Sequence, residues 1–397
     1  MKHSQSLPEP DADALLHSQK LVARIKDEIE NNNGSISFRR YMEMALYEPG
    51  LGYYVAGTHK IGAEGDFVTA PEISPLFSQC VANQCSDVFN LLAEEKKYQK
   101  QGGWVLELGA GSGKMASDIL LELERQNQLP EKYLILDLSP DLIQRQKETF
   151  LASIPHLLDR IEWIDQLPQG FNGIIIGNEV LDAMPVEVFT LHDKDIYQHH
   201  VIWENNQLCE QLQVASADFK KEVEALDLSD NITPYTSEFN PNLRGWLQAL
   251  EQCLDRGVVL LFDYGYPKKE YYLAERNKGT LICHYQHLVN EAPLFYPGLQ
   301  DITANVNFSA VAEEADALGF HVSGFTSQAS FLANCDLEYY FMQALDHNPD
   351  TQYQLAQQVR ILSLPSEMGE RFNAIALSKQ IQQPLKGFSS FDQRFRL

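Results

Sequence analysis

Residues 104–113, Trp-Val-Leu-Glu-Leu-Gly-Ala-Gly-Ser-Gly, constrain the fold of this chain more than any other segment. A helix-like segment follows at once, over 114–127. Glycine adopts positive φ at little cost and lets a ligand approach the main chain closely. The pattern therefore predicts a buried strand, a tight turn and the start of a helix in an α/β sheet. The apolar run ends in an acid and three alternating glycines, which are Glu107, Gly109, Gly111 and Gly113.

The glycine spacing is G-x-G-x-G, and an acid precedes the first glycine. This combination favours S-adenosylmethionine (SAM) over a dinucleotide, because a pyrophosphate prefers a helix N-terminus without a nearby anion. A sulfonium cation with an amino-acid tail tolerates carboxylates. Taken by itself, the motif also fits a nucleotide site or a turn that serves only packing. We expect Glu107, Ala110 and the glycines to contact the cofactor.

A second buried strand is predicted over 132–137, and it ends in Asp137. In doubly wound folds an acid at this position accepts hydrogen bonds from a ribose. Asp137 lies 28 positions after Gly109, beyond the usual spacing of about 20, and the long intervening helix accounts for the difference. Helix capping is the alternative role. We interpret Asp137 as the ribose ligand, Leu138 as a neighbouring cofactor contact, and Ser139 as the helix cap.

A third polar constellation, Asn178-Glu-Val-Leu-Asp182, follows the predicted strand at 173–177. Ligands bind at the carboxyl ends of such strands, so Asn178 is expected in the crevice, near both cofactor and acceptor. Glu179 and Asp182 are three positions apart, and one helical turn would place both carboxylates on one face. A helix cap is again the alternative, and both interpretations predict partial exposure.

Composition narrows the functional classes. The 397 residues are 44% hydrophobic and 22% charged, which suits one large domain with insertions or two domains. The formal net charge of −24 argues against nucleic-acid binding, since a phosphate backbone must be met by Lys and Arg. It permits cationic partners such as arginine-containing protein segments, although solubility explains such a charge equally well. The cysteines and histidines lack metal-ligand spacing, so no metal site is expected.

The ends and the apolar runs of the chain bear on its location. The first 20 residues are polar and lack the apolar core of a signal peptide. No apolar run approaches the length of a membrane span. We therefore expect a cytoplasmic protein without membrane insertion.

Alternating strand and helix patterns predict a doubly wound, mostly parallel α/β sheet. Its strands are expected at 104–108, 133–137, 161–164, 173–177 and 257–263, with a later one at 319–325. Short antiparallel strands are expected near 186–191, 196–203 and 208–214. The predicted regions are a disordered 1–20, a cap region 21–100, a core 101–330 with insertions at 186–245 and 268–308, and a helical region 331–397.

Five motifs occur in order along the chain, from the segment Gly-Asp-Phe-Val-Thr-Ala-Pro-Glu-Ile-Ser at 65–74 to Gly-Leu-Gln-Asp-Ile-Thr-Ala-Asn-Val-Asn-Phe at 298–308. Between them lie the glycine motif, Gly-Asn-Glu-Val-Leu-Asp-Ala-Met-Pro at 177–185 and Phe-Asp-Tyr-Gly-Tyr-Pro at 262–267. Together they resemble the MidA-like family of SAM-dependent methyltransferases, over roughly three quarters of the chain. Two departures are Asp137, where the family pattern suggests Glu, and Asn307, where Asp is common.

The resemblance implies a seven-stranded, Rossmann-like methyltransferase sheet with a helical N-terminal cap and a β-rich insertion. Mitochondrial members of the family are complex I assembly factors that methylate an arginine on a complex I subunit. A similar reaction on a protein arginine is therefore expected here, with Asn178, Glu179 and Asp182 at the acceptor. Weaker candidates are Asp66, Glu72 and Asp301.

Two other functions remain open from the sequence. One is methylation of a small molecule, because the fold does not determine the acceptor. The other is an assembly or interaction protein that keeps the methyltransferase fold without catalysis. The intact glycines and Glu107 argue against this second alternative. The sequence leaves the oligomeric state open.

Overall fold

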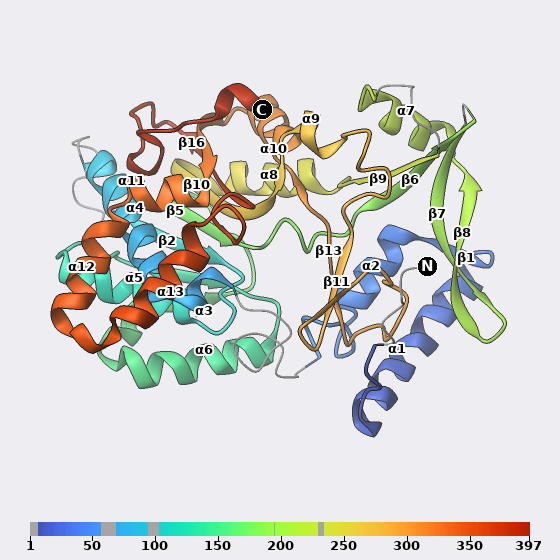
Figure 1. Ribbon diagram of the computed structural model, residues 1–397, viewed down its shortest axis with the longest axis horizontal. Helices are drawn as coiled ribbons and strands as arrows, with labels where there is room; N and C mark the ends of the chain where they lie inside the picture. Colours follow the sequence, from blue (N-terminus) through green and yellow to red (C-terminus); the bar gives the residue numbers. More distant parts are fainter. Residues whose placement is uncertain (1–6, 57–68, 94–102, 194, 229–233) are drawn as a thin grey trace.

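The computed structural model describes residues 7–56, 69–93, 103–193, 195–228 and 234–397 (Figure 1). Its central sheet has the strand order β15-β16-β10-β5-β2-β3-β4, and β14 (Val306–Asn307) pairs with β10 at one end. The neighbours from β10 to β4 run parallel. Five strands confirm the sequence prediction: β2 (Trp104–Leu108), β3 (Tyr133–Leu136), β4 (Ile161–Ile164), β5 (Phe171–Asn178) and β10 (Leu254–Tyr266).

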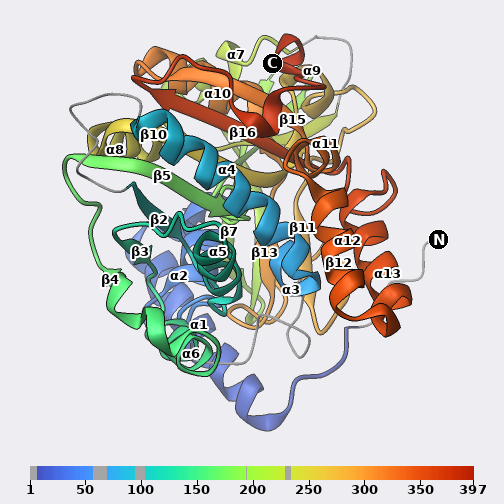
Figure 2. The ribbon, with the colours of Figure 1, turned by 90° about the vertical axis from the view of Figure 1, so that its left-hand side faces the viewer.

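The central strands are buried on both faces, as their continuous apolar runs predict. Alternate residues of β10 point into two different clusters: Val258 and Leu260 into one, Val259 and Leu261 into the other. Figure 2 shows α4 and α5 crossing the first face. The helices that contribute to the first cluster include α4 (Pro75–Ala93), α5 (Lys114–Arg125) and α6 (Pro140–Ser153), and those of the second include α8 (Leu243–Cys253) and α10 (Phe308–Ala317).

The C-terminal region differs from its prediction. The helices α11 (Gln328–Asn334), α12 (Leu337–His347) and α13 (Gln352–Ser363) are present. However, β16 (Phe372–Lys379) is a strand that lies antiparallel between β10 and β15 (His321–Ser327). A purely helical 331–397 is therefore wrong. The run Ala-Ile-Ala-Leu at 374–377 has no periodicity that separates a buried strand from a buried helix.

The N-terminal region also corrects a prediction. Helix α1 (Ala12–Asn31) begins at Ala12, where the Asp11 carboxylate accepts a hydrogen bond from the Ala14 amide at 2.8 Å. The disorder expected over 1–20 is thus wrong for 12–20, because Leu21, Ile25 and Ile29 are buried along one face of this helix. After β1 (Ser35–Ser37), α2 (Phe38–Tyr47) begins with Ser37 as its N-cap, whose hydroxyl accepts a hydrogen bond from the Arg40 amide at 3.2 Å. A short helix, α3 (Ala70–Ile73), precedes α4.

The two insertions form β-rich structure. The three predicted antiparallel strands are β6 (Glu187–His192), β7 (Asp195–Glu204) and β8 (Gln207–Val214), and β1 and β9 (Tyr235–Phe239) extend their sheet. Helix α7 (Ala217–Ala225) follows β8. The second insertion contains α9 (Lys268–Tyr271) and a three-stranded sheet of β11 (Ile282–Tyr285), β12 (Leu288–Asn290) and β13 (Asp301–Thr303).

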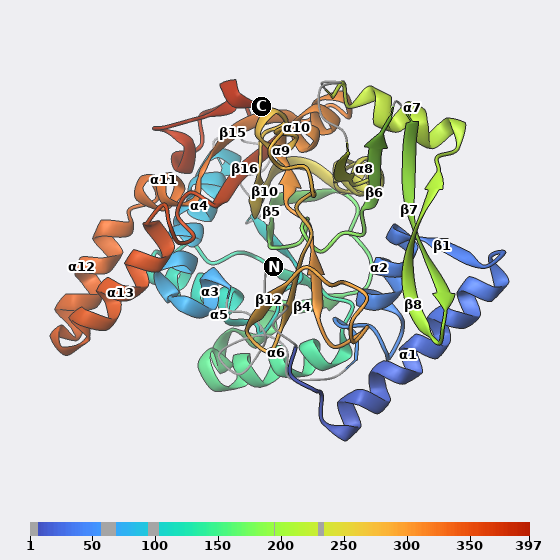
Figure 3. The same ribbon diagram turned by 45° about the vertical axis from the view of Figure 1, so that its right-hand side comes forward.

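The N-terminal region and both insertions share one apolar core, so they form a second lobe beside the central sheet (Figure 3). Ile25 and Tyr41 of the N-terminal helices, Val188 of β6 and Ile302 of β13 all belong to this core. Four 3₁₀ turns complete the description: Pro155–Arg160, Pro349–Thr351, Lys386–Phe388 and Arg394–Arg396. No helix within the described ranges has the length and apolar character needed to cross a membrane.

A buried arginine closes the end of α4. Arg256 is 2% exposed, and its guanidinium donates to the carbonyls of Leu91, Leu92 and Gln380 at 3.2–3.3 Å. Arg256→Met would leave these carbonyls without a donor, so we expect a loss of about 3 kcal/mol of unfolding free energy in urea titration. The control Arg244→Met removes an exposed ion pair with Glu314 and should cost less than about 1 kcal/mol. Equal losses in the two variants would contradict this role.

Candidate active site

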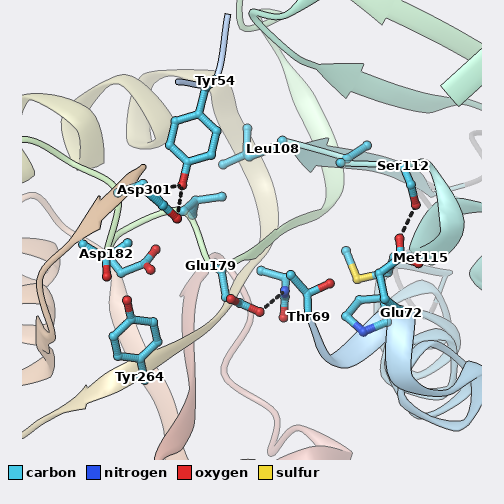
Figure 4. A pocket seen from close by; sticks show the side chains of 18 of the residues that line it. Tyr54, Thr69, Glu72, Leu108, Ser112, Met115, Glu179, Asp182, Tyr264 and Asp301 are labelled. Carbon is cyan, nitrogen blue, oxygen red and sulfur yellow. Dashed lines mark hydrogen bonds between the residues drawn. The ribbon is translucent and has the colours of Figure 1, made fainter. Parts of the chain in front are cut away.

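A cavity of about 820 Å³ opens at the carboxyl ends of β2, β3, β5 and β10 (Figure 4). The central sheet supplies one side of the cavity through the glycine turn, Asp137 and the segment after β5. The second lobe supplies the other side through Tyr47, Tyr54 and residues of β11 and β13. The cavity therefore joins the two lobes at the position where doubly wound sheets bind ligands.

The glycine turn has the predicted conformation. Gly109, Gly111 and Gly113 all have positive φ, at +68°, +54° and +83°. A Cβ built at Gly111 meets no atom within 4 Å, so the turn faces open space in the cavity. Gly113 instead packs against Phe150 behind the turn and is absent from the cavity wall.

Two acids flank this turn at the ends of β2 and β3. Glu107 is 1% exposed and accepts a hydrogen bond from the Tyr133 hydroxyl at 2.7 Å. Its burial raises the pKa of the Glu107 carboxyl to about 7. Asp137 accepts from the Ser139 amide at 2.9 Å and lines the cavity, and burial also raises its pKa.

Gln146 connects the turn and Asp137, and sequence reasoning missed it. Its side-chain amide donates to the Gly111 carbonyl at 3.1 Å and to Asp137 at 2.8 Å, while Trp163 donates to its oxygen at 2.8 Å. A fully buried glutamine inside an ordinary helix pattern gives no local signal in the sequence.

Ser139 is the N-cap of α6, as predicted, and accepts from the Leu142 amide at 3.4 Å. Leu138 lines the cavity edge and is 71% exposed. The cavity thus offers an acid at the ends of β2 and β3, a turn open to a ligand, and the buried Asn178 Oδ1, which has no hydrogen-bond partner within the described residues. These features fit a ligand with ribose, amino-acid and adenine parts such as SAM.

The segment after β5 is a bend rather than the expected helical turn. Glu179 has φ +54°, and its amide donates to the Phe262 carbonyl of β10 at 2.9 Å. Asp263, on the same strand, accepts from the amides of Leu181 and Asp182 at 2.9 and 3.3 Å. These interstrand contacts replace helical hydrogen bonds, so both the helical-turn and the helix-cap interpretations of this segment are wrong.

The bend nevertheless brings Glu179 and Asp182 to one place in the cavity (Figure 4). Asp182 is only 4% exposed, which corrects the expected partial exposure of this residue. Its Oδ1 is buried without a hydrogen-bond partner in the described structure. Asn178 donates to the Glu179 carboxylate at 3.1 Å.

The second lobe contributes a further acid. Asp301, the first residue of β13, is 2% exposed and accepts from the Tyr54 hydroxyl at 2.9 and 3.0 Å. In Figure 4 the Tyr264 hydroxyl approaches Asp182 from the side opposite Tyr54. Sequence reasoning did not single out these tyrosines, because only the fold brings their distant segments together.

Burial and mutual repulsion raise the pKa values of these acids. The pKa of Glu179 rises to about 8 through burial and the charge of Asp182. The pKa of Asp182 rises to about 6 through burial, and that of Asp263 lies well above its usual value because burial and the charges of Asp182 and Glu179 oppose ionisation.

The remaining predicted site residues lie elsewhere. Glu72 of α3 accepts a hydrogen bond from Ser112, so it borders the glycine turn instead of the acids after β5 (Figure 4). Asp66 lies outside the described residues. Asn307 caps α10 by accepting from the Ala310 amide at 3.2 Å.

Comparisons with known proteins agree with this architecture. Residues 80–326 match the family described as "putative S-adenosyl-L-methionine-dependent methyltransferase". A Burkholderia thailandensis protein with bound S-adenosyl-homocysteine is 37% identical over 99% of this chain and 100% of that one, with a TM-score of 0.92. The chain belongs to this family, and it is a SAM-dependent methyltransferase with the Rossmann-like fold.

Curated relatives extend the comparison. The Drosophila melanogaster "Protein arginine methyltransferase NDUFAF7 homolog, mitochondrial" is 27% identical over 98% of this chain and 93% of its own length. The Danio rerio "Protein arginine methyltransferase NDUFAF7, mitochondrial" is 27% identical over 91% and 90%. These names place the relatives in mitochondria, and the cytoplasmic location expected from the sequence is wrong by this comparison.

The glycine turn can be tested with Gly111→Val. A branched side chain at this position would project into the cavity, so we expect at least tenfold weaker binding of S-adenosyl-homocysteine by calorimetric titration. Gly319→Val is the matched control, because Gly319 also has positive φ and open space but lies at the end of α10. Similar affinities in the two variants would remove the turn from the cofactor site.

A second test concerns the stability of the protein as a function of pH. The folded state binds the Glu179 proton more tightly than the unfolded state, so wild-type stability falls as pH rises from about 5 to about 8. Glu179→Gln does not titrate. Its melting temperature relative to wild type should therefore rise over this pH range, by about 2–4 °C for each kcal/mol of unfolding free energy that the wild type loses. A melting-temperature difference between Glu179→Gln and wild type that stays constant over this pH range would contradict the raised pKa of Glu179.

Proposed function

We propose that this enzyme transfers the SAM methyl group to a guanidinium nitrogen of an arginine on a protein substrate. The observation that carries the proposal is the buried Asp182 Oδ1, which lacks a hydrogen-bond partner among the described residues and belongs to a residue that lines the cavity beside Glu179. A buried carboxylate oxygen of this kind needs a donor, and a guanidinium carries five in a planar fork. The names of the curated relatives support the same acceptor.

The cofactor side is assigned to the ends of β2 and β3. We propose that Glu107, Gly109, Ala110, Gly111 and Asp137 hold SAM, with Leu138 and Asn178 at its edges. When bound there, SAM supplies an electrophilic methyl group. The protein then needs mainly to align the acceptor nitrogen with that group and to exclude water.

The acceptor side is assigned to Glu179 and Asp182. A guanidinium has a pKa above about 12 and delocalised lone pairs, so its nitrogens are poor nucleophiles. Two carboxylates that accept its N–H groups localise the positive charge and orient one nitrogen. As the new N–C bond forms and the bond between the methyl carbon and the sulfonium sulfur breaks, that nitrogen would lose a proton, which the carboxylate of Asp182 or Glu179 would accept. Asp301 and Tyr54 border the same space from the second lobe.

The resemblance to the MidA-like family suggests a subunit of respiratory complex I as one such substrate. A small-molecule acceptor is the competing hypothesis. Incubating the purified enzyme and labelled SAM with lysate of a strain that lacks the enzyme, followed by mass spectrometry, separates the two. Methylarginine on a protein supports the proposal, whereas label found only in small molecules contradicts it.

Substitution of the two acids tests their roles. Glu179→Gln and Asp182→Asn keep the side-chain shape but remove charge, so we expect single-turnover methyl transfer to fall tenfold or more, about 1.4 kcal/mol of transition-state stabilisation. S-adenosyl-homocysteine affinity should stay within twofold. Glu122→Gln, far from the cavity wall, is the control and should transfer methyl at the wild-type rate. A collapse of cofactor affinity in the acid variants would assign these residues to the cofactor instead.

A further inference from the structure

Two buried acids outside the cavity each have a cationic partner. Glu122 is 3% exposed and pairs with Arg125 at 2.7 Å, and Glu187 is 7% exposed and pairs with Arg39 at 3.0 Å. The acids at the ends of β5 and β10 differ. In the described part of the chain, no ion pair joins Glu179, Asp182 or Asp263 to a lysine or arginine.

Among the residues that the structure describes, the hydrogen-bond donors to these three acids are neutral. Asp263 accepts from backbone amides, among them that of Tyr264 at 2.9 Å, and Glu179 accepts from the Asn178 side-chain amide. Asp182 faces the Tyr264 hydroxyl, while its Oδ1 has no donor within the described ranges. Neutral donors offset only part of the cost of burying several negative charges close together.

The surroundings add further acid and phenol groups. Tyr47 and Tyr54 approach from the N-terminal region, and Asp301 approaches from β13, where it lies opposite His284 of β11. Arg371, before β16, lines the same cavity. Glu179, Asp182 and Asp263 therefore form a site suited to a positively charged group. When no such group is bound, ionisation of all three carboxyl groups at once is unfavourable.

We propose that the cluster of Glu179, Asp182 and Asp263 holds at least one proton in the free enzyme and releases it when a cationic acceptor binds. This inference rests on the proposed arginine acceptor and specifies how the site recognises it. The acceptor cation takes the place of the proton, so the buried carboxylates keep a compensating charge in both states. The raised pKa values of Glu179 and Asp263 agree with a proton held near neutral pH.

Two consequences follow for acceptor recognition. Release of one proton makes acceptor affinity rise by up to about tenfold per pH unit while the cluster is protonated. A neutral isostere of the guanidinium, such as a urea, cannot replace the proton electrostatically. The cluster therefore selects for charge as well as for planar shape.

The first half of this inference is that the cluster holds a proton in the free enzyme. Infrared difference spectra between the full-length wild-type enzyme and each variant, at pH 7 and without an acceptor, test it. We expect a C=O stretch of a protonated carboxyl that Glu179→Gln or Asp182→Asn removes or shifts. Glu122→Gln should leave the band as in the wild type, because Glu122 does not line the cavity and pairs with Arg125. A wild-type spectrum without such a band overturns the inference, even if the enzyme methylates arginine.

Methylguanidinium and methylurea, each added with S-adenosyl-homocysteine, test the second half. Methylguanidinium should abolish the protonated-carboxyl band, and methylurea should leave it. Calorimetry in two buffers with different ionisation heats should give about one proton released per methylguanidinium bound. If the protonated-carboxyl band persists with methylguanidinium bound, the proposed proton release is wrong, but the arginine acceptor is not contradicted. If the band is present but methylguanidinium does not bind, both the proton release and the cationic acceptor are contradicted.

Discussion

The arrangement of Glu179 and Asp182, the proposed acceptor side of the cavity, depends on the Asp263 carboxylate. It bridges two neighbouring strands, because it is part of β10 and accepts from the amides of Leu181 and Asp182 after β5. Without it, these buried amides would lose their partners, at a cost of about 1–3 kcal/mol each. The bend at Glu179, which has positive φ, would keep the hydrogen bond from the Glu179 amide to the Phe262 carbonyl but lose these two contacts with β10. One buried acid therefore helps to position two others.

The two lobes contribute different residues to the cavity. The central sheet supplies the glycine turn and the acids of β2 and β3, as in any doubly wound ligand site. The second lobe supplies Tyr54 and Asp301, which are 247 positions apart and joined by a hydrogen bond. The shared apolar core of the N-terminal helices and the insertions holds this pair against the crevice. Insertions between strands can thus define an acceptor without altering the cofactor side.

The sequence predicts the parts of this protein that local patterns determine. Continuous apolar runs identify β5 and β10, and alternating glycines identify the turn after β2. The bend at Glu179 was unpredictable, since its hydrogen-bond partners belong to a strand about 80 positions later. Gln146 and Tyr54 were missed for the same reason: their roles come from tertiary contacts. The strand β16 lacks a distinguishing period, so it was taken for helix.

The position of β16 also bears on how the chain folds during synthesis. This strand lies between β10 and β15 but is made after both, close to the C-terminus. During synthesis, the facing edges of β10 and β15 therefore remain unpaired until residues 372–379 have been made. Unpaired strand edges invite association with other chains. Strand β16 thus completes the sheet, and a chain without it would leave the facing edges of β10 and β15 unpaired.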